Sequence, residues 1–241
     1  MSEDPIFAAI DATWPAARLF KVGPWQLRDG QGGGKRVSAA TAAAAVGPSD
    51  VPEAEQAMLR EGLQLLFMIR PGEEALDAAL DARGYSVLDP TTAYSLPVAG
   101  LTDVPVPRVT AFCIWEPLAI MEEIWAQGGI GPERLAVMPR ASVKTGILAR
   151  WNEKPAGVAF AALHRTTCMV HAVEILPEQR RQGVAGWVMR AAAFWAQAQG
   201  AKDISVLCTQ ENTAANRLYS SLGFVPVGHY HYRYKDLQEV Q

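Results

Sequence analysis

Residues 168–199 constrain the fold more than any other part of this chain. An apolar, β-like run over 168–176 leads through a short basic turn with Gly183 directly into a long helical pattern. One helix face is apolar along that pattern, at Val184, Trp187, Val188, Ala191 and Trp195. The first N–H groups of a helix lack intrahelical acceptors, and the helix dipole adds partial positive charge there. A strand, a basic turn and a helix in this order therefore predict an anion site within an α/β fold.

The surrounding apolar patterns extend this expectation to a whole domain. They predict helices over 117–127 and 212–222, and strands over 143–149, 157–163, 204–208, 224–227 and 230–234. Two strands followed by alternating strands and helices are typical of a mixed sheet with a parallel central pair. The predicted fold class is α/β of a mixed, α+β-like type, with a central twisted sheet flanked by helices.

Charge and proline content divide the chain. Residues 1–107 carry a net charge of −6 and residues 108–241 a net charge of +3, and the stretch 96–107 holds three prolines without any period. We therefore predict an N-terminal domain over 1–100, a linker over 101–107 and a second domain over 108–241.

Composition limits the class of protein. The overall charge of −3 argues against a nucleic-acid partner, and the apolar runs are too short to span a membrane. The acidic N-terminal sequence and three cysteines in apolar stretches predict a cytoplasmic protein, either a monomer or a homodimer.

Two motifs in the second half resemble the GCN5-related N-acetyltransferase (GNAT) family. Arg180-x-x-Gly183-x-Ala185 matches that family's Q/R-x-x-G-x-G/A acetyl-CoA signature. A second signature follows at the family's spacing, Asn212-x-x-Ala215-x-x-Leu218-Tyr219-x-x-Leu222-Gly223-Phe224. The resemblance covers residues 108–235 and implies the GNAT fold with acetyl-CoA as cosubstrate.

The resemblance also implies the positions of the cosubstrate. Backbone groups of Val173 to Ile175 would pair with the pantetheine arm, Asn212 would lie beside the pantetheine or the acetyl end, and Ala215 would also contact the cosubstrate. Tyr219 would direct its hydroxyl at the sulfur. The pyrophosphate would be bound by the turn and the start of the helix, at Arg180, Arg181, Gln182, Gly183, Val184, Ala185 and Gly186.

Acetyl transfer requires an uncharged amine, an oxyanion donor and a proton for the leaving thiolate. A backbone N–H on the strand with Val173 and Ile175 would serve the oxyanion. Tyr219, with an ordinary pKa near 10, matches a thiolate in basicity, although a tyrosine that packs a helix on the sheet is the alternative. Asn212 has an alternative role as the N-cap of the following helix.

The sequence does not decide the general base. Some family members carry a carboxylate where Leu207 stands here, so Glu174 is the nearest candidate, beside a water chain or an already deprotonated amine. The histidines and Cys168 lack the spacing of a zinc site, so we expect no metal. The glycine-rich stretch 30–35 lacks the Ser or Thr of a phosphate-binding loop and is interpreted as a hairpin tip.

The first 100 residues repeat part of the second half. A shift of 139 aligns residues 67–85 with 206–224 without a gap, and only Ala75/Ala214 and Gly84/Gly223 are identical. Glu73 replaces Asn212, Leu80 replaces Tyr219, and no Arg-x-x-Gly-x-Ala precedes them. We interpret this half as a degenerate GNAT-like copy without a cofactor site, with earlier strands over 25–28 and 36–41 and a helix over 51–63. An unrelated α/β cap is the alternative.

The predicted function is an acetyl-CoA-dependent N-acetyltransferase that acts on a primary amine of a small molecule or peptide by direct attack on the thioester. The alternative is a non-catalytic acyl-CoA-binding or regulatory module. Tyr219, Asn212 and the phosphate turn are kept in one copy and lost in the other, which favours the enzyme. The sequence does not name the acceptor.

Overall fold

The computed structural model describes residues 5–236, so the acidic residues 1–4 lie outside it. The chain forms two compact units, each assembled from separate stretches of sequence. Unit 1 contains residues 5–15, 93–208 and 212–227, and unit 2 contains residues 16–92, 209–211 and 228–236. Two strands, β5 (Ser86–Pro97) and β11 (Val225–Lys235), each begin in one unit and end in the other. The units therefore do not divide at the predicted linker 101–107, because contacts between distant segments define them.

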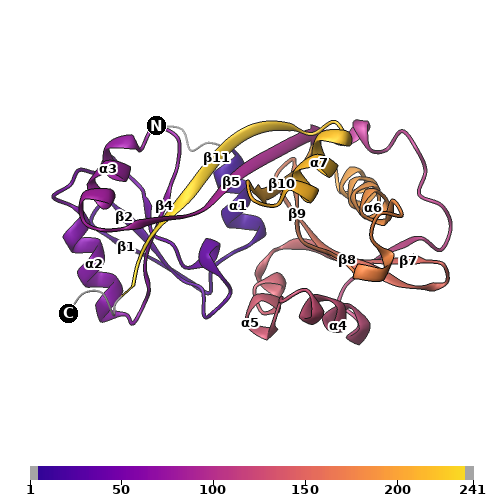
Figure 1. Ribbon diagram of the computed structural model, residues 1–241, viewed down its shortest axis with the longest axis horizontal. Helices are drawn as coiled ribbons and strands as arrows, with labels where there is room; N and C mark the ends of the chain where they lie inside the picture. The colour runs from indigo at the N-terminus through magenta and orange to yellow at the C-terminus, as the bar shows by residue number, and fades with distance from the viewer. Residues whose placement is uncertain (1–4, 237–241) are drawn as a thin grey trace. The chain divides into compact units, whose positions relative to one another are not determined.

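Unit 1 is built on a mixed sheet (Figure 1), as predicted. Its first four strands form an antiparallel ladder, and β10 pairs in parallel with β9. Parts of β5 and β11 follow beyond β10. The ladder strands and β10 have the bounds β6 Ala111–Ile114, β7 Val143–Trp151, β8 Lys154–His164, β9 Thr167–Ile175 and β10 Asp203–Thr209.

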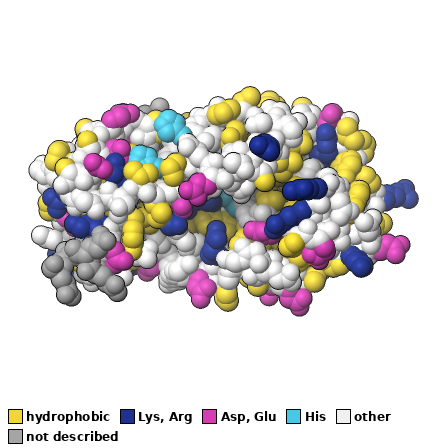
Figure 2. Space-filling model, in the orientation of Figure 1, with side chains coloured by type: hydrophobic (Ala, Val, Ile, Leu, Met, Phe, Trp, Pro, Cys, Tyr) yellow, Lys and Arg dark blue, Asp and Glu magenta, His cyan; other side chains and the backbone are white. Residues whose placement is uncertain are grey.

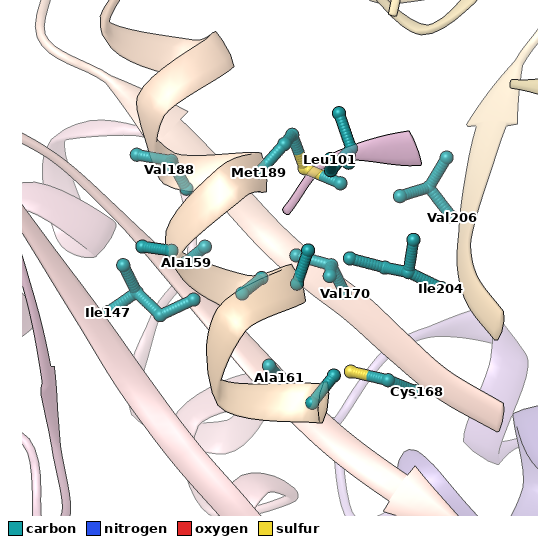
Figure 3. Close-up of a cluster of buried hydrophobic side chains, with 14 of the residues drawn as sticks. Leu101, Ile147, Ala159, Ala161, Cys168, Val170, Val188, Met189, Ile204 and Val206 are labelled. Carbon is teal, nitrogen blue, oxygen red and sulfur yellow. The ribbon is translucent and has the colours of Figure 1, made fainter. Parts of the chain in front are cut away.

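Helix α6 (Val184–Ala198) covers one face of this sheet. Small side chains on the strands, such as Ala159 and Ala161 of β8, let the helix approach closely, and Val188 and Met189 of the helix belong to the same buried cluster, with Met189 beside Leu101 (Figure 3). The predicted apolar helix face is confirmed at Val184, Val188 and Ala191, which are buried, whereas Trp187 and Trp195 are only half-buried.

Two helices contact the strands β8 and β9 on the other side: α1 (Pro5–Thr13) and α4 (Ala119–Gln127). Along β8 the buried side chains alternate, so Ala159 and Ala161 face α6 while Val158 and Phe160 face the opposite way. The sequence predicted α4 but missed α1. The short α5 (Pro132–Leu135) follows α4, and α7 (Thr213–Ser221) follows β10.

Unit 2 has its own core around aromatic side chains. Phe67 meets Trp25 and Tyr85 in edge-to-face contacts, with ring centroids 5.2 and 5.5 Å apart. These rings come from β2, β4 and the residue before β5, and helices α2 and α3 contribute further apolar side chains. The bounds are β1 Arg18–Val22, β2 Trp25–Asp29, β3 Thr41–Ala42, α2 Val51–Arg60, β4 Leu65–Ile69 and α3 Glu74–Ala82.

Several predicted element bounds were wrong. The two strands expected over 224–227 and 230–234 are one strand, β11, which continues through Gly228. In place of the strand expected over 36–41, Lys35–Val37 form a 3-10 turn and the short β3 begins only at Thr41. The first residues of the 96–107 stretch complete β5, and Leu101 is buried in the core of unit 1. Tertiary contacts order segments that show no period of their own.

The shift of 139 residues aligns matching local structures. Helix α3 starts at Glu74 and α7 at Thr213, and both have 9 residues. After each helix a glycine has a positive φ, of 81° at Gly84 and 90° at Gly223. The next aromatic residue then donates its N–H back to the last turn: Tyr85 to Leu80 O at 3.1 Å, and Phe224 to Tyr219 O at 3.0 Å. The two segments thus share helix length, C-cap and the start of the following strand.

A buried arginine joins α3 to β11 in unit 2. Arg233 is 7% exposed, and its Nε donates to Asp77 Oδ1 at 2.7 Å while its Nη1 donates to Asp81 Oδ1 at 2.6 Å and to Tyr85 O at 2.9 Å. His231 Nε2 lies 2.8 Å from the same Asp77 oxygen. The hydrogen bond from Arg233 holds the pKa of Asp77 below its ordinary value.

We expect Asp77→Asn to lower the free energy of unfolding by about 1–3 kcal/mol at neutral pH, because it removes the charge-assisted partner of a buried guanidinium. A carboxylate whose folded pKa is lowered stabilises above its unfolded pKa of about 4, and that contribution is lost as pH falls through the folded value. Urea unfolding at pH 7 and across the acid range measures both effects. Asp81→Asn is the control, because that side chain is 69% exposed and its loss should cost less. Equal stability of the Asp77 variant and the parent would contradict the assignment.

Candidate active site

The two parallel strands of unit 1 separate part-way along their length. The pairing of β9 with β10 runs from Thr167/Asp203 to Val170/Val206. Beyond that point β9 continues to Ile175 and β10 to Thr209. Only β8 pairs with β9 over 171–175 among the described residues, so no strand covers the other edge of that segment, although side chains donate to the carbonyls of Ala172 and Ile175. An extended ligand can add to this edge as a further strand does.

A β-bulge in β9 accompanies this separation. Between the pairs Phe160/His171 and Val158/Glu174, β9 has one residue more than β8, and Ala172 there has a φ of 51°. The buried indole of Trp125 on α4 donates its Nε1–H to Ala172 O at 2.8 Å. Helix α4 therefore holds the bulge.

The bulge sets the direction of the side chains that follow. Val173 and Ile175 pack with the core under α6, whereas Glu174 pairs with Val158 on the opposite face. Burial raises the pKa of Glu174, and the charges of Arg180 and Arg134 oppose that rise.

The basic turn leads from β9 into α6 with two residues in the left-handed region. Arg181 has a φ of 60° and Gly183 a φ of 80°. Gly183 is the N-cap of α6 and no side chain caps the first helical N–H groups. The structure thus confirms that the turn opens directly into the helix.

Space remains in front of that helix end. A Cβ placed on Gly183 or on Gly186 would meet no atom within 4 Å. Arg180 is turned back to the strand, where its Nε donates to Ile175 O at 2.9 Å, and Gln182 donates to Glu178 O at 3.0 Å. Val184 is buried in the core, so it contributes only its backbone to this side, and Ala185 is half-buried. Several Lys and Arg side chains gather over the part of unit 1 that holds β9, α6 and α7 (Figure 2).

Asn212 caps the N-terminus of α7, which is the alternative role predicted for it. Its Oδ1 accepts the N–H of Ala215 at 3.1 Å, which makes it the N-cap of α7. Its backbone carbonyl accepts a hydrogen bond from Asn216 at 2.9 Å and lies 3.8 Å from the sulfur of Cys208. Burial raises the pKa of the Cys208 thiol to about 11, so this cysteine is protonated at neutral pH.

Tyr219 is buried on α7, with 6% of its surface exposed. Its ring lies against Phe224 and Tyr94, at centroid distances of 5.7 and 6.1 Å. Burial raises the pKa of its hydroxyl above the ordinary value, and the nearby Cys208 and Glu174 raise it further. No described residue hydrogen-bonds this hydroxyl, whereas the hydroxyl of Tyr94 donates to Asn216 at 2.9 Å. Tyr219 is thus a protonated phenol beside the point where β9 and β10 separate.

Sequence reasoning missed part of the opposite face. His171 is buried on β9, with its Nε2 3.0 Å from Thr13 Oγ1 of α1, and its ring packs on Phe160 and Trp14. From the sequence, His171 was a candidate only for a metal ligand. The pattern of α1 gave no sign of the contact between Thr13 and His171. Among the described residues no three His, Cys, Asp or Glu side chains form a group that could hold a metal ion. In the same part of the chain, no helix is both long and apolar enough to cross a membrane.

Residues 117–224, which hold α4, the diverging strands and both helix N-termini, match the model of the acetyltransferase (GNAT) family. This stretch is therefore similar to that family. The similarity supports an acetyl-CoA-dependent N-acetyltransferase, in agreement with the two motifs in the sequence.

The likeness extends beyond the family match. A Bacillus subtilis (strain 168) protein, the uncharacterized N-acetyltransferase YobR, is 27% identical over 237 residues, which cover 93% of this chain and 95% of that protein. A GCN5-related N-acetyltransferase from Kribbella flavida shares the fold with a TM-score of 0.73 and 22% identity, over 95% of this chain and 94% of its own. A tandem GNAT protein from the clavulanic acid biosynthesis pathway shares it with a TM-score of 0.59 and 13% identity, over 87% and 76%. The sequence outside the family match thus has counterparts in other GNAT-like proteins.

We expect Gly183→Val to weaken CoA binding at least tenfold, about 1.4 kcal/mol. A branched side chain would fill the open space before α6 and strain a backbone with a φ of 80°. Calorimetric titration with CoA measures the change.

Gly200→Val is the matched control, because Gly200 follows the other end of α6, has a φ of 84° and also has open space at its Cβ position. It should show similar strain and unchanged CoA affinity. Equal CoA affinity of both folded variants and the parent would contradict a phosphate site at Gly183.

Proposed function

We propose that the protein transfers the acetyl group of acetyl-CoA to a primary amine of a small-molecule or peptide acceptor. The observation that carries this proposal is the separation of β9 from β10 beside the uncapped N-terminus of α6. Backbone groups of Val173 to Ile175 would bind the pantetheine arm along the free edge of β9. The turn and the first residues of α6, from Arg180 to Gly186, would bind the pyrophosphate, and Asn212 with Ala215 would border the acetyl end.

Direct attack on the thioester fits the groups around this gap. The neutral amine nitrogen forms a bond to the carbonyl carbon, and a backbone N–H of β9 stabilises the oxyanion. The carbon–sulfur bond then breaks, and the thiolate takes the proton of the Tyr219 hydroxyl. Tyr219 regains a proton that originates from the acceptor nitrogen, so the products are the amide and free CoA. The raised pKa keeps Tyr219 protonated at neutral pH and also makes it a weaker acid than an ordinary tyrosine, so the thiolate takes the proton only as its negative charge develops beside the phenol.

A thiol-release screen with acetyl-CoA and a panel of amines tests this function. CoA release that depends on the acceptor is expected, and mass spectrometry should show an acetyl group on the amine. Absence of acceptor-dependent release with every amine would favour the acyl-CoA-binding or regulatory module instead.

Tyr219→Phe should lower kcat and kcat/KM by similar factors of about 10²–10⁴, because it removes only the proton donated in the transition state. Affinity for acetyl-CoA should change little, since the ring and its packing remain. Steady-state kinetics and calorimetry provide the two readouts.

Tyr94→Phe is the control, because its hydroxyl belongs to the same cluster but is already bonded to Asn216. It should retain most of the activity. Full activity of Tyr219→Phe would exclude the Tyr219 hydroxyl as the general acid. A variant that loses stability but keeps its activity would show that Tyr219 serves packing alone.

We further propose that residues 1–100 are a degenerate GNAT-like copy, joined through 101–107 to the catalytic domain 108–241. The matching lengths and caps of α3 and α7 support this, as does the existence of a tandem GNAT protein with a similar fold. In the first copy Leu80, which is fully buried, stands at the position of Tyr219. Glu73 precedes α3 without capping it, at the position of Asn212.

This copy should therefore bind no CoA. Calorimetry on the whole chain is expected to show one CoA site per chain, and Gly183→Val should abolish or weaken all of the observed binding. Two equivalent sites per chain, or a residual site of parental affinity in that variant, would contradict the degenerate copy. A cytoplasmic location, a monomeric or homodimeric state, and the absence of membrane and nucleic-acid partners remain parts of the same proposal.

A further inference from the structure

Gly128 ends α4 for a reason other than backbone conformation. Its φ of −81° is one that any residue adopts, and its N–H closes the helix on Ile124 O at 3.1 Å. The next residue, Gly129, has a φ of 77°, where glycine is required for its conformational freedom. The backbone conformation therefore does not explain the glycine at 128, and the space around its Cα has to be considered.

The space of a Gly128 side chain is occupied by Glu174. A Cβ at Gly128 would lie 2.5 Å from the Cδ of Glu174, 2.6 Å from its Cγ and 2.8 Å from its Oε2. These atoms form the outer part of a flexible side chain, so an added methyl group would displace the carboxylate rather than the backbone of β9. Glycine at 128 thus leaves the space that this carboxylate occupies.

That place is on the face of the sheet opposite Tyr219. Glu174 follows the bulge and pairs with Val158, on the side of α4, whereas Tyr219 belongs to the core under α6. The unpaired edge of β9 separates the two groups. A carboxylate on one side of the gap and a phenol on the other suit an amine that approaches from one side while the thiolate leaves on the other.

We propose that Gly128 is a positioning residue, which holds the Glu174 carboxylate where it binds the ammonium group of the acceptor and accepts its proton. This rests on the proposed function and narrows its substrate class to primary amines that arrive protonated. One N–H bond of the ammonium breaks, its proton passes to Glu174, and the freed electron pair attacks the thioester carbon. The second proton lost by this nitrogen replaces the one that Tyr219 gives to the thiolate.

The charged groups around Glu174 determine its titration. Arg134 of α5 and Arg180 of the basic turn favour the carboxylate, while the interior favours the neutral acid, so the pKa of Glu174 is raised. Tyr219 lies near enough to interact with it, and His171 is on the same strand and the same face. A carboxylate displaced towards solvent by a methyl group at 128 should titrate at lower pH.

The test compares Gly128→Ala with Gly131→Ala in the full chain. Gly131 lies in the same loop with a φ of −82°, and its Cβ would come only within 3.3 Å of the end of the Glu133 side chain. We expect Gly128→Ala to lower kcat/KM for the acceptor at least tenfold and to shift its acid limb to lower pH, with acetyl-CoA affinity within twofold of the parent. Gly131→Ala should behave as the parent in every readout.

A second measurement does not depend on turnover. Carboxyl-carbon NMR of the free protein, with Glu174→Gln to assign the signal, should show Glu174 titrating at lower pH in Gly128→Ala than in the parent. In the double variant Gly128→Ala/Glu174→Gln, the alanine should cost no further activity, since both changes act through one carboxylate. Parental kinetics and an unchanged NMR titration in a folded Gly128→Ala protein would overturn the proposal. If the parent acetylates no amine but the NMR shift is present, the positioning stands and the proposed function fails.

Discussion

One hydrogen bond, from the indole of Trp125 to the carbonyl of Ala172, fixes the backbone on which the site depends. A residue with a φ of 51° in the middle of a strand is strained, and it persists only where its surroundings hold it. The bond ties the bulge to α4, and beyond the bulge β9 no longer pairs with β10. The free strand edge begins at this irregularity, and the direction of Glu174 follows from it.

The two faces of the sheet in unit 1 carry different kinds of side chain. The α6 face is packed with alanines and branched side chains, which bring the uncapped helix end close to the end of β9. The opposite face carries the titratable groups Glu174 and His171, beside aromatic rings from β8 and from the segment after α1. Because the backbone edge between the faces is open, groups on either side can act on one bound thioester. Each face supplies one of the two proton-handling groups of the proposed reaction.

Two strand–helix–strand segments that lie 139 residues apart share a local structure but differ in polar residues. Both have the same helix length, a glycine with positive φ after the helix and an aromatic residue after that glycine. The second segment carries Asn212 and Tyr219. At the corresponding positions the first segment has Glu73 and the buried Leu80, so its helix packs without a hydroxyl there.

The sequence by itself determined the order of the main elements, the basic turn before α6, the N-cap at Asn212 and the repeat at 139 residues. All of these depend on residues close to one another in the chain, so their periodicity and helix caps can be recognised in the sequence. Tertiary structure alone decided the rest. The contact of Gly128 with Glu174 joins residues 46 positions apart, and that of Thr13 with His171 joins residues 158 apart. The two units are likewise assembled from distant segments, so no composition boundary could mark them. Which face a strand residue occupies after a bulge depends on one inserted residue, and only the pairing with the neighbouring strand reveals it.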